Sequence, residues 1–296
     1  MTHVATLISA PTAPVLDAAL IEAARAHLGA EEADVLATGI AVDLAFAAEP
    51  GTEREIADDL RARLAAPIDV VVQPVKTRAK GLLIADMDST MIGQECIDEL
   101  AAELGLKEKI SAITERAMRG EIAFEPALRE RVGLLAGLPA NVVDKVIAER
   151  IRLTPGAVEL VRTMRANGAY TALVSGGFTV FTGPISRLIG FHENRANILI
   201  EEHGRLAGTV AEPILGQDAK RASLLELATA KKVPMELTLA VGDGANDLAM
   251  IKESGLGVAY HAKPKVAAEA HARIDHGDLT ALLYLQGYRR GDFVAH

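Results

Sequence analysis

Hydrophobic positions along the chain follow two periods, and together they predict alternating strands and helices from residue 81 onward. Short apolar runs ended by a turn predict buried parallel strands, and apolar residues at i, i+3, i+4 and i+7 predict helices. The predicted strands are 82–85, 170–174, 237–241, 255–260 and 273–274; the predicted helices are 157–167, 178–188, 217–232, 248–253, 265–270 and 279–286. Residues 198–200 and 206–210 predict a short hairpin. The alternation is typical of an α/β fold with a doubly wound, Rossmann-like parallel sheet.

The first 79 residues have a different pattern and predict a separate α+β domain. Strands are expected at 4–8, 35–36, 40–46 and 69–73, and helices at 15–28 and 53–64. The resulting βαββαβ order is that of ferredoxin-like folds. The polar stretch 74–80 carries three cations and predicts a linker. This element order resembles ACT-type amino-acid-sensing domains. Whether the domain binds an amino acid, or is a structural or dimerising module that makes the protein a homodimer, stays open.

Residues 93–153 interrupt the α/β pattern with helical periodicity alone. Helices are expected at 97–104, 109–119, 126–135 and 141–150. We therefore expect a helical cap at 93–153, inserted into a core made of 80–92 and 154–296. Because the insertion directly follows a strand that ends in two aspartates, it is a candidate lid over that strand's carboxyl end.

Composition narrows the classes of function. The chain has 296 residues, half of them hydrophobic, and a net charge of −9. This negative charge argues against a nucleic acid partner, because phosphate backbones require clustered cations. The single cysteine, Cys96, excludes an internal disulfide and suits the reducing cytoplasm. No apolar run is long enough to span a membrane, and the first ten residues lack the pattern of a signal peptide.

Two aspartates, Asp86 and Asp88, follow the apolar run 82–85. Open α/β folds place their ligands at the carboxyl ends of their strands. Strand alternation would direct both carboxylates to the same side, where a cation or hydrogen-bond donors must compensate their desolvation. The pair therefore marks a candidate site at this edge of the sheet.

Three later stretches carry polar groups of the same kind. Ser175-Gly176-Gly177 follows a predicted strand, where small residues let backbone N–H groups approach an anion. Lys220 lies in the first turn of a predicted helix, and the turn 242–247 holds two aspartates and an asparagine beside two glycines. Taken alone, Ser-Gly-Gly is an ordinary turn and Lys220 is typical of a solvated surface lysine. The acidic turn is denser in polar residues than a turn needs.

Taken in order, Asp86-Met87-Asp88-Ser89-Thr90, Ser175-Gly176-Gly177, Lys220 and the turn 242–247 resemble the four motifs of haloacid-dehalogenase-type phosphatases. The resemblance covers residue 81 to the end of the chain. Glu95 and the run 124–135 with Arg131 resemble more narrowly the members of this family that act on O-phospho-L-serine, in the last step of L-serine biosynthesis.

The resemblance implies a role for each matching residue. Asp86 would be the nucleophile that becomes an aspartyl-phosphate, and Asp88 the general acid and then base. Mg²⁺ would be bound by Asp86, Asp243 and the backbone carbonyl of Asp88, with Asp247 supporting the metal and Lys220. The residues expected to bind substrate are Glu95, Met118, Phe124, Arg131, Ser175, Gly176, Gly177, Lys220 and Asn246.

Other readings stay open on the sequence. Within the same family, the substrate could be another small phosphomonoester, or the phosphoryl group could pass to a second alcohol. In a different class, the aspartates could belong to a receiver-like regulatory protein that binds a metal and accepts phosphate. Asp88 distinguishes the classes, since a receiver needs no acid for an alcohol leaving group.

Overall fold

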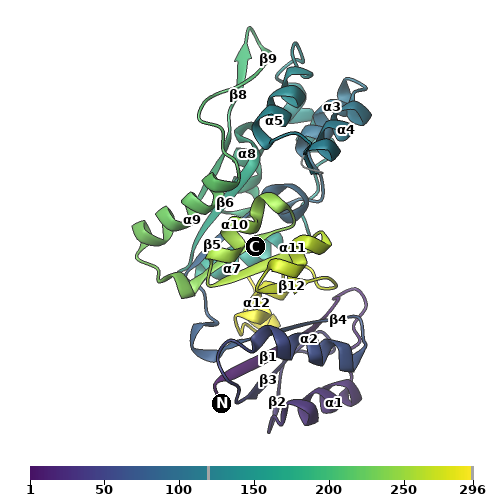
Figure 1. Ribbon diagram of the computed structural model, residues 1–296, viewed down its shortest axis with the longest axis vertical. Coiled ribbons are helices and arrows are strands. Elements are labelled where there is room, and N and C mark those ends of the chain that lie inside the picture. The colour runs from purple at the N-terminus through teal and green to yellow at the C-terminus, as the bar shows by residue number, and fades with distance from the viewer. Residues whose placement is uncertain (119–120, 295–296) are drawn as a thin grey trace.

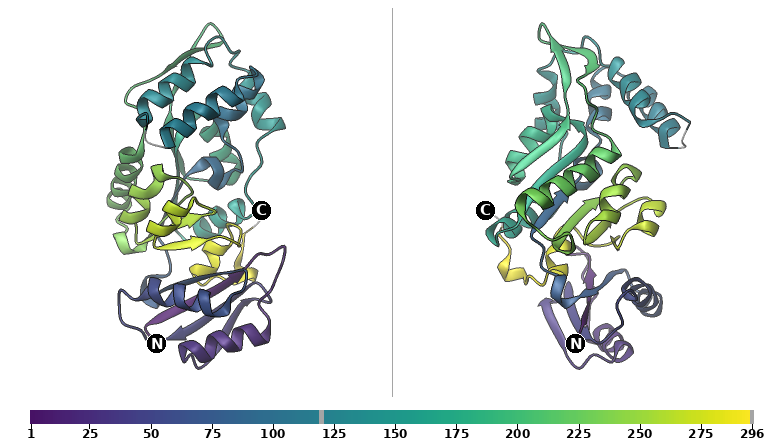
Figure 2. Two further views of the ribbon diagram at one scale, coloured as in Figure 1. Left: turned by 45° about the vertical axis from the view of Figure 1, so that its right-hand side comes forward. Right: turned by 60° about the vertical axis from the view of Figure 1, so that its left-hand side comes forward.

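The computed structural model describes residues 1–118 and 121–294 in three parts arranged along one long axis (Figures 1 and 2). A parallel sheet in the middle has the strand order β12-β11-β10-β5-β6-β7. Its strands are β5 (Leu82–Ala85), β6 (Tyr170–Phe178), β7 (Glu193–Asn197), β10 (Thr238–Gly242), β11 (Leu256–Tyr260) and β12 (Ala272–Ile274). The parallel α/β core expected from the apolar runs is confirmed.

Helices cover both faces of this sheet, as a doubly wound fold requires. They are α7 (Ala157–Ala166), α8 (Thr179–Ile189), α9 (Gln217–Lys231), α10 (Leu248–Glu253), α11 (Pro264–Glu269) and α12 (Ala281–Leu285). Leu82 and Ile84 of β5 pack with α9 and α10 on one face, whereas Leu83 and Ala85 pack with the opposite helices α7, α8 and α12. Strand β5 is thus buried on both faces, which explains its unbroken apolar run.

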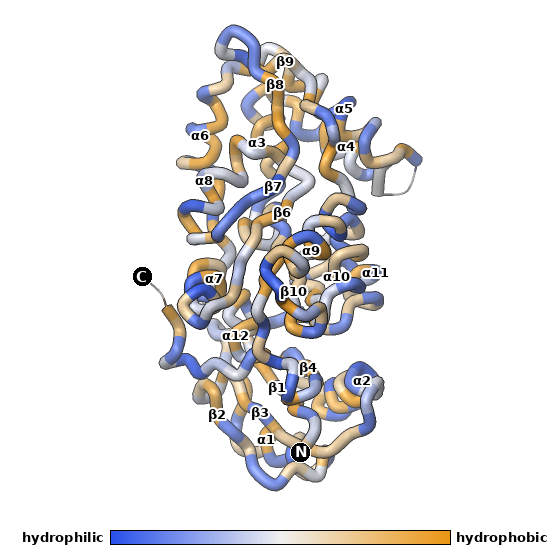
Figure 3. Tube along the Cα trace, turned by 90° about the vertical axis from the view of Figure 1, so that its left-hand side faces the viewer, coloured by the Kyte–Doolittle hydropathy of each residue, from blue (hydrophilic) through white to orange (hydrophobic). Residues whose placement is uncertain are grey.

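Strand β7 is the one core strand that the apolar pattern did not predict. It is hydrophilic along its length (Figure 3) and pairs with β6 at the edge of the sheet. Most of its residues are half-exposed. An edge strand of this kind needs no apolar residues, so hydrophobic periodicity cannot detect it.

Four helices form a cap beyond the carboxyl ends of the strands: α3 (Cys96–Glu103), α4 (Lys107–Met118), α5 (Phe124–Gly133) and α6 (Val142–Glu149). The chain enters and leaves this segment through paired residues, Ile92 and Leu153. A hairpin of β8 (Leu199–Glu202) and β9 (Arg205–Val210) extends from the core and packs on α5 (Figures 1 and 2). The backbone N–H of Gly137 donates to the Leu206 carbonyl, so this predicted hairpin fixes the cap from the core side.

The N-terminal part contains an antiparallel sheet of order β2-β3-β1-β4, covered by two helices. Its elements are β1 (His3–Ser9), α1 (Ala18–Leu28), β2 (Ala33–Ala37), β3 (Ala41–Phe46), α2 (Glu53–Leu64) and β4 (Ile68–Pro74). The ferredoxin-like order is therefore confirmed. Amino-acid binding and dimerisation by this part stay predictions.

The stretch 74–80, expected to be a polar linker, makes specific contacts with both neighbouring parts. Arg78 donates to Asp43 Oδ2 at 2.7 Å and to the carbonyls of Tyr284 and Leu285. Lys80 is only 7% exposed and donates to the Glu236 carbonyl. Arg78 and Lys80, two of its three cations, are therefore hydrogen-bonded within the protein, and the linker between the two parts stays a prediction. Among the described residues, no helix is both long and apolar enough to cross a membrane.

Candidate active site

Asp86 and Asp88 lie in a turn at the carboxyl end of β5, not in the strand. The strand ends at Ala85, and the turn Met87–Met91 includes Ser89 in the left-handed region at φ 53°. Strand alternation is therefore the wrong reason for placing the two carboxylates together. The turn itself directs them: Asp86 accepts the Met87 N–H at 2.8 Å, and Asp88 Oδ2 lies 3.4 Å from Ser175 Oγ.

Lys220 joins two of the predicted aspartates inside the protein. Its Nζ lies 2.7 Å from Asp86 Oδ1 and 2.7 Å from Asp247 Oδ1, and the side chain is fully buried. Burial opposes the charged amine, but the two carboxylates outweigh it and raise the pKa of Lys220. A solvated surface lysine is thus excluded.

The carboxylates of Asp86, Asp243 and Asp247 form a cluster that fits a divalent cation. Their ligand oxygens all lie within 4.8 Å of one another. Three carboxylates with one ammonium leave a formal charge of −2, which a divalent ion would balance, and Mg²⁺ prefers oxygen ligands. Burial and repulsion from Asp86 and Glu95 raise the pKa of Asp243 to about 7, as expected where negative charge is crowded.

This cluster differs in one member from the predicted metal ligands. The side chain of Asp247 takes part, although it was expected only to support the metal and Lys220. The carboxylate of Asp88 is not in the cluster, since it accepts the Cys96 N–H at 2.9 Å. The expected contribution of the Asp88 backbone carbonyl stays a prediction.

Glycines in the turn 242–247 leave room for the acidic side chains. A Cβ on Gly242 would lie 2.4 Å from Asp247 Cγ, so no larger residue fits there. The Gly244 N–H donates to Asp247 Oδ2 at 3.1 Å and orients that carboxylate. A Cβ on Gly176 would lie 4.0 Å from Asn246 Nδ2, which places the predicted substrate-binding amide beside the Ser-Gly-Gly segment.

Ser175, Gly176 and Gly177 were expected to form a turn, but they continue strand β6 as far as Phe178. The pairing register with β7 shifts between Val174 and Phe178, so the segment bulges toward the site. The Gly177 N–H donates to Ser175 Oγ at 2.9 Å, and a Cβ on Gly177 would lie 2.8 Å from Asp88 Oδ2. Glycine is required here by close approach to Asp88, not by a positive φ.

Asp88 is held between the core and the first cap helix. Its Oδ1 accepts from the backbone of Cys96 at the start of α3, and its Oδ2 faces Ser175. Burial, with repulsion from Glu95 and Asp86, raises the pKa of Asp88 to about 7. A carboxyl group with a pKa near neutrality can donate and accept a proton at physiological pH.

The cap brings a cation and an anion toward Asp88. Arg131 on α5 is half-buried, and burial lowers its pKa against the attraction of Asp98, Glu95 and Asp88. Glu95 accepts from Ser89 Oγ at 2.7 Å. Desolvation, together with repulsion from Asp86 and Asp98, raises the pKa of Glu95. A substrate carrying both signs of charge could be recognised here.

Phe124 also reaches the site from the cap. A Cβ on Gly176 would lie 3.5 Å from its ring and one on Gly216 would lie 3.3 Å from it, so the ring packs on the Ser-Gly-Gly segment. The side chain of Met118, the remaining predicted contact, lies outside the described residues.

Four residues at the site were not among those predicted from the sequence. Thr90 Oγ1 donates to Asp243 at 3.4 Å, and Thr114 Oγ1 accepts from Arg131 at 3.2 Å. Asn197 Nδ2 donates to the Gly176 carbonyl at 2.8 Å, and Ser89 holds Glu95. Ser89 and Thr90 belong to the Asp-Met-Asp-Ser-Thr motif, which could have indicated them. Thr114 and Asn197 contact residues that are distant in the sequence, so no local sequence pattern could have indicated them.

The chain is similar in sequence and in fold to known proteins. The family model of haloacid dehalogenase-like hydrolases matches residues 83–252. A phosphoserine phosphatase of Streptomyces coelicolor is 44% identical over 234 residues, 79% of this chain, and the match spans 57% of that protein's length. The crystal structure of a HAD family hydrolase from Salmonella enterica serovar Typhi superposes with a TM-score of 0.84 at 29% identity, covering 96% of this chain and 98% of that one.

A second solved structure concerns the chemistry more directly. It is described as a phospho-aspartyl intermediate analogue of phosphoserine phosphatase and is 40% identical to this chain. Its TM-score is 0.65, and the match covers 70% of this chain and 98% of that one.

Proposed function

This chain belongs to the haloacid dehalogenase-like hydrolase family, and we propose that it hydrolyses O-phospho-L-serine to L-serine and phosphate, with Mg²⁺, as the last step of L-serine biosynthesis in the cytoplasm. The observation that carries the proposal is the position of Asp86. Its carboxylate lies at the end of β5, 2.7 Å from a buried ammonium, and it interacts electrostatically with Glu95 of the cap.

Asp86 acts as the nucleophile in the first half of the reaction. A carboxylate oxygen forms a bond to phosphorus while the bond from phosphorus to the serine oxygen breaks, which leaves an aspartyl-phosphate. Asp88 donates its proton to the departing serine oxygen, because an alkoxide is a poor leaving group. The raised pKa of Asp88, about 7, supports this role.

In the second half, Asp88 takes a proton from water, and the resulting oxygen attacks phosphorus. The bond between phosphorus and Asp86 breaks, which releases phosphate and restores the carboxylate. The transferred phosphoryl group is surrounded by Ser175, by the backbone of Gly176 and Gly177, and by Asn246. Lys220 supplies positive charge beside Asp86.

Mg²⁺ would be held by the carboxylates of Asp86 and Asp243, with Asp247 beside them, and would neutralise charge between the nucleophile and the phosphate. The cap residues select the substrate: Arg131 binds the α-carboxylate of phosphoserine and Glu95 its α-ammonium. Phe124, which packs on the Ser-Gly-Gly segment, closes the apolar side.

Rapid-quench kinetics with ³²P-labelled phosphoserine test the covalent step. We expect Asp86→Asn to abolish both turnover and phosphate incorporation into the protein. A burst of labelled protein in that variant would refute Asp86 as the nucleophile. Chelation of Mg²⁺ should stop turnover, and activity that persists without metal would refute the metal's role.

Substrate choice is tested separately with Arg131→Ala. Loss of a charge-assisted contact of ~3 kcal/mol should lower kcat/KM for phosphoserine by about 10²-fold. A simple phosphomonoester without the amino-acid group should be affected much less. Arg129→Ala is the matched control, because Arg129 lies on the same helix and pairs with Glu212 on the surface. Equal losses on both substrates would mean that Arg131 serves folding of the cap or phosphate binding, and the assignment of phosphoserine would lose its main support.

A further inference from the structure

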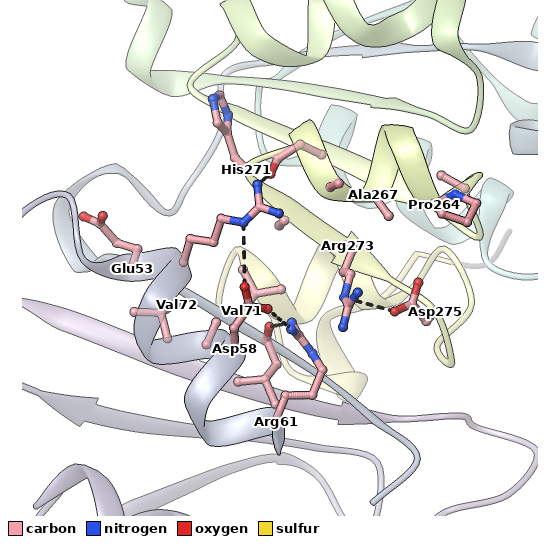
Figure 4. Close-up of a pocket in the computed structure, with 17 residues that line it drawn as sticks. Glu53, Asp58, Arg61, Val71, Val72, Pro264, Ala267, His271, Arg273 and Asp275 are labelled. Carbon is pink, nitrogen blue, oxygen red and sulfur yellow. Dashed lines mark hydrogen bonds and ion pairs between the residues drawn. The ribbon is translucent and has the colours of Figure 1, made fainter. Parts of the chain in front are cut away.

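A cavity of about 370 Å³ lies between the N-terminal part and the core, and no candidate active-site residue lines it. Helix α2 forms one wall, and α11 with β12 forms the other (Figure 4). Ala57, Ala267 and Ala268 contribute an apolar part of the lining. With Val70, Val71 and Val72 of β4 on the side of α2, the two sides of the lining lie at least 190 residues apart in the chain, so a ligand bound here would contact both parts of the protein.

Three carboxylates line the cavity, and each is already engaged by another group. Asp58 is hydrogen-bonded to Arg61, and Asp275 Oδ2 lies 3.2 Å from Arg273 Nε (Figure 4). Glu53 is bonded to His3 at 3.1 Å. Arg61 is also used within its own domain, since it donates to the Val70 carbonyl at 2.7 Å. Together with Arg54, Arg61 and Arg273, the three carboxylates leave the lining formally neutral.

The donors that remain come from both walls. Arg54 donates to the Ala270 carbonyl at 3.2 Å. Its Nε also lies 3.7 Å from Asp58 Oδ2, but the same Asp58 carboxylate already pairs with Arg61. Arg273 Nε is buried and has no aligned hydrogen-bond partner among the described residues. His271 Nδ1 accepts the Gly257 N–H at 2.9 Å, so in the neutral ring Nε2 carries the proton and is a donor.

We propose that this interdomain cavity binds a small oxyanion through Arg54, Arg273 and His271. Guanidinium groups match carboxylate and phosphate oxygens with paired N–H donors. The alanine side accommodates a short apolar group, which suits a small organic carboxylate; inorganic phosphate offers the same oxyanion chemistry. Because the ligand contacts both parts, its binding stabilises the docking of the N-terminal part on the core.

Isothermal titration calorimetry on the full chain tests the site, with sodium propionate and sodium phosphate in separate arms and sodium chloride at equal ionic strength as the blank. We expect at least one anion to bind with a Kd below about 10 mM. Arg54→Gln and Arg273→Gln should each weaken that binding about tenfold or more. Binding in the propionate arm identifies the carboxylate as a ligand, and binding in the phosphate arm identifies phosphate.

Two further variants separate this site from others. Arg63→Gln removes an exposed cation from the same helix and should leave binding unchanged. Arg131→Gln, in the candidate active site, should also leave it unchanged, and Arg54→Gln should keep full phosphoserine hydrolysis without added anion. No binding in either arm overturns the proposal. The proposal is also overturned if Arg63→Gln weakens anion binding as much as Arg54→Gln does, or if Arg131→Gln is the one variant that loses anion binding. The Arg273→Gln variant decides the question if Arg54→Gln does not fold.

Discussion

Lys220 Nζ and Asp86 Oδ1 lie 2.7 Å apart, and both side chains are almost completely removed from solvent. The same ammonium lies 2.7 Å from Asp247. A buried charge is tolerated only when an opposite charge compensates its lost hydration. Asp86 and Lys220 therefore depend on one another for stability.

Removing the lysine should destabilise the fold. We expect Lys220→Ala to lower the free energy of unfolding by about 3–5 kcal/mol, because it leaves two buried carboxylates beside an empty space. Chemical denaturation with and without Mg²⁺ measures this, and Mg²⁺ should restore part of the loss. Lys109→Ala, an exposed cap lysine, should change stability by less than about 0.5 kcal/mol. A similar small effect for Lys220→Ala would contradict the pairing.

Asp88 should matter most for poor leaving groups. We expect Asp88→Asn to slow single-turnover phosphorylation by phosphoserine by about 10²–10⁴-fold, because the serine oxygen then leaves without a proton. p-Nitrophenyl phosphate, whose leaving group needs no acid, should phosphorylate the variant with a much smaller loss. If both esters lost the same factor in this step, Asp88 would not be the acid.

Thr114 is expected to position Arg131. The guanidinium donates to Thr114 Oγ1 and to the Ala127 carbonyl, both at 3.2 Å. Thr114→Val removes one of these acceptors with little change in volume, and should raise KM for phosphoserine about tenfold with kcat changed less. Thr114→Ser should keep the wild-type KM. A loss shared by Ser and Val variants would instead indicate a packing role for the methyl group.

The stability of the protein should depend on pH through Lys80. Burial lowers the pKa of Lys80 to about 8, against the attraction of Glu236. Between this pKa and the ordinary value of 10.5 the unfolded chain binds more protons than the folded one, so the Lys80 contribution to stability rises with pH.

We therefore compare wild type with Lys80→Met by urea denaturation at pH 7 and pH 10. The stability of wild type relative to the variant should increase by about 1–3 kcal/mol over this interval. Groups that Lys80 does not influence titrate alike in both proteins, so their effect cancels in the difference. Burial and Lys80 lower the pKa of His271 from 6.5, so this group titrates below the pH interval. A pH-independent difference would show that Lys80 is charged and solvated in the folded protein.

Local patterns predicted most of the elements because each depends on residues close in sequence. The run 82–85 indicated a strand buried on both faces, and helical spacing indicated the cap. The prediction failed at β7, a polar edge strand, and at Ser175-Gly176-Gly177, where glycines typical of a turn continue β6. Gly177 is needed there because Asp88, 89 positions earlier in the chain, lies against its backbone.

By itself, the sequence determined the parallel α/β core, the helical insertion and the polar residues that end the strands. The period of the hydrophobic residues indicates which side chains are buried, and short motifs indicate the local backbone conformation. Tertiary structure decided which of those groups meet: Lys220 with Asp86, Arg131 with Thr114, and α2 with β12 around the interdomain cavity. These pairings join distant segments, and no local pattern encodes them, because they depend on how strands and helices stack after each has formed.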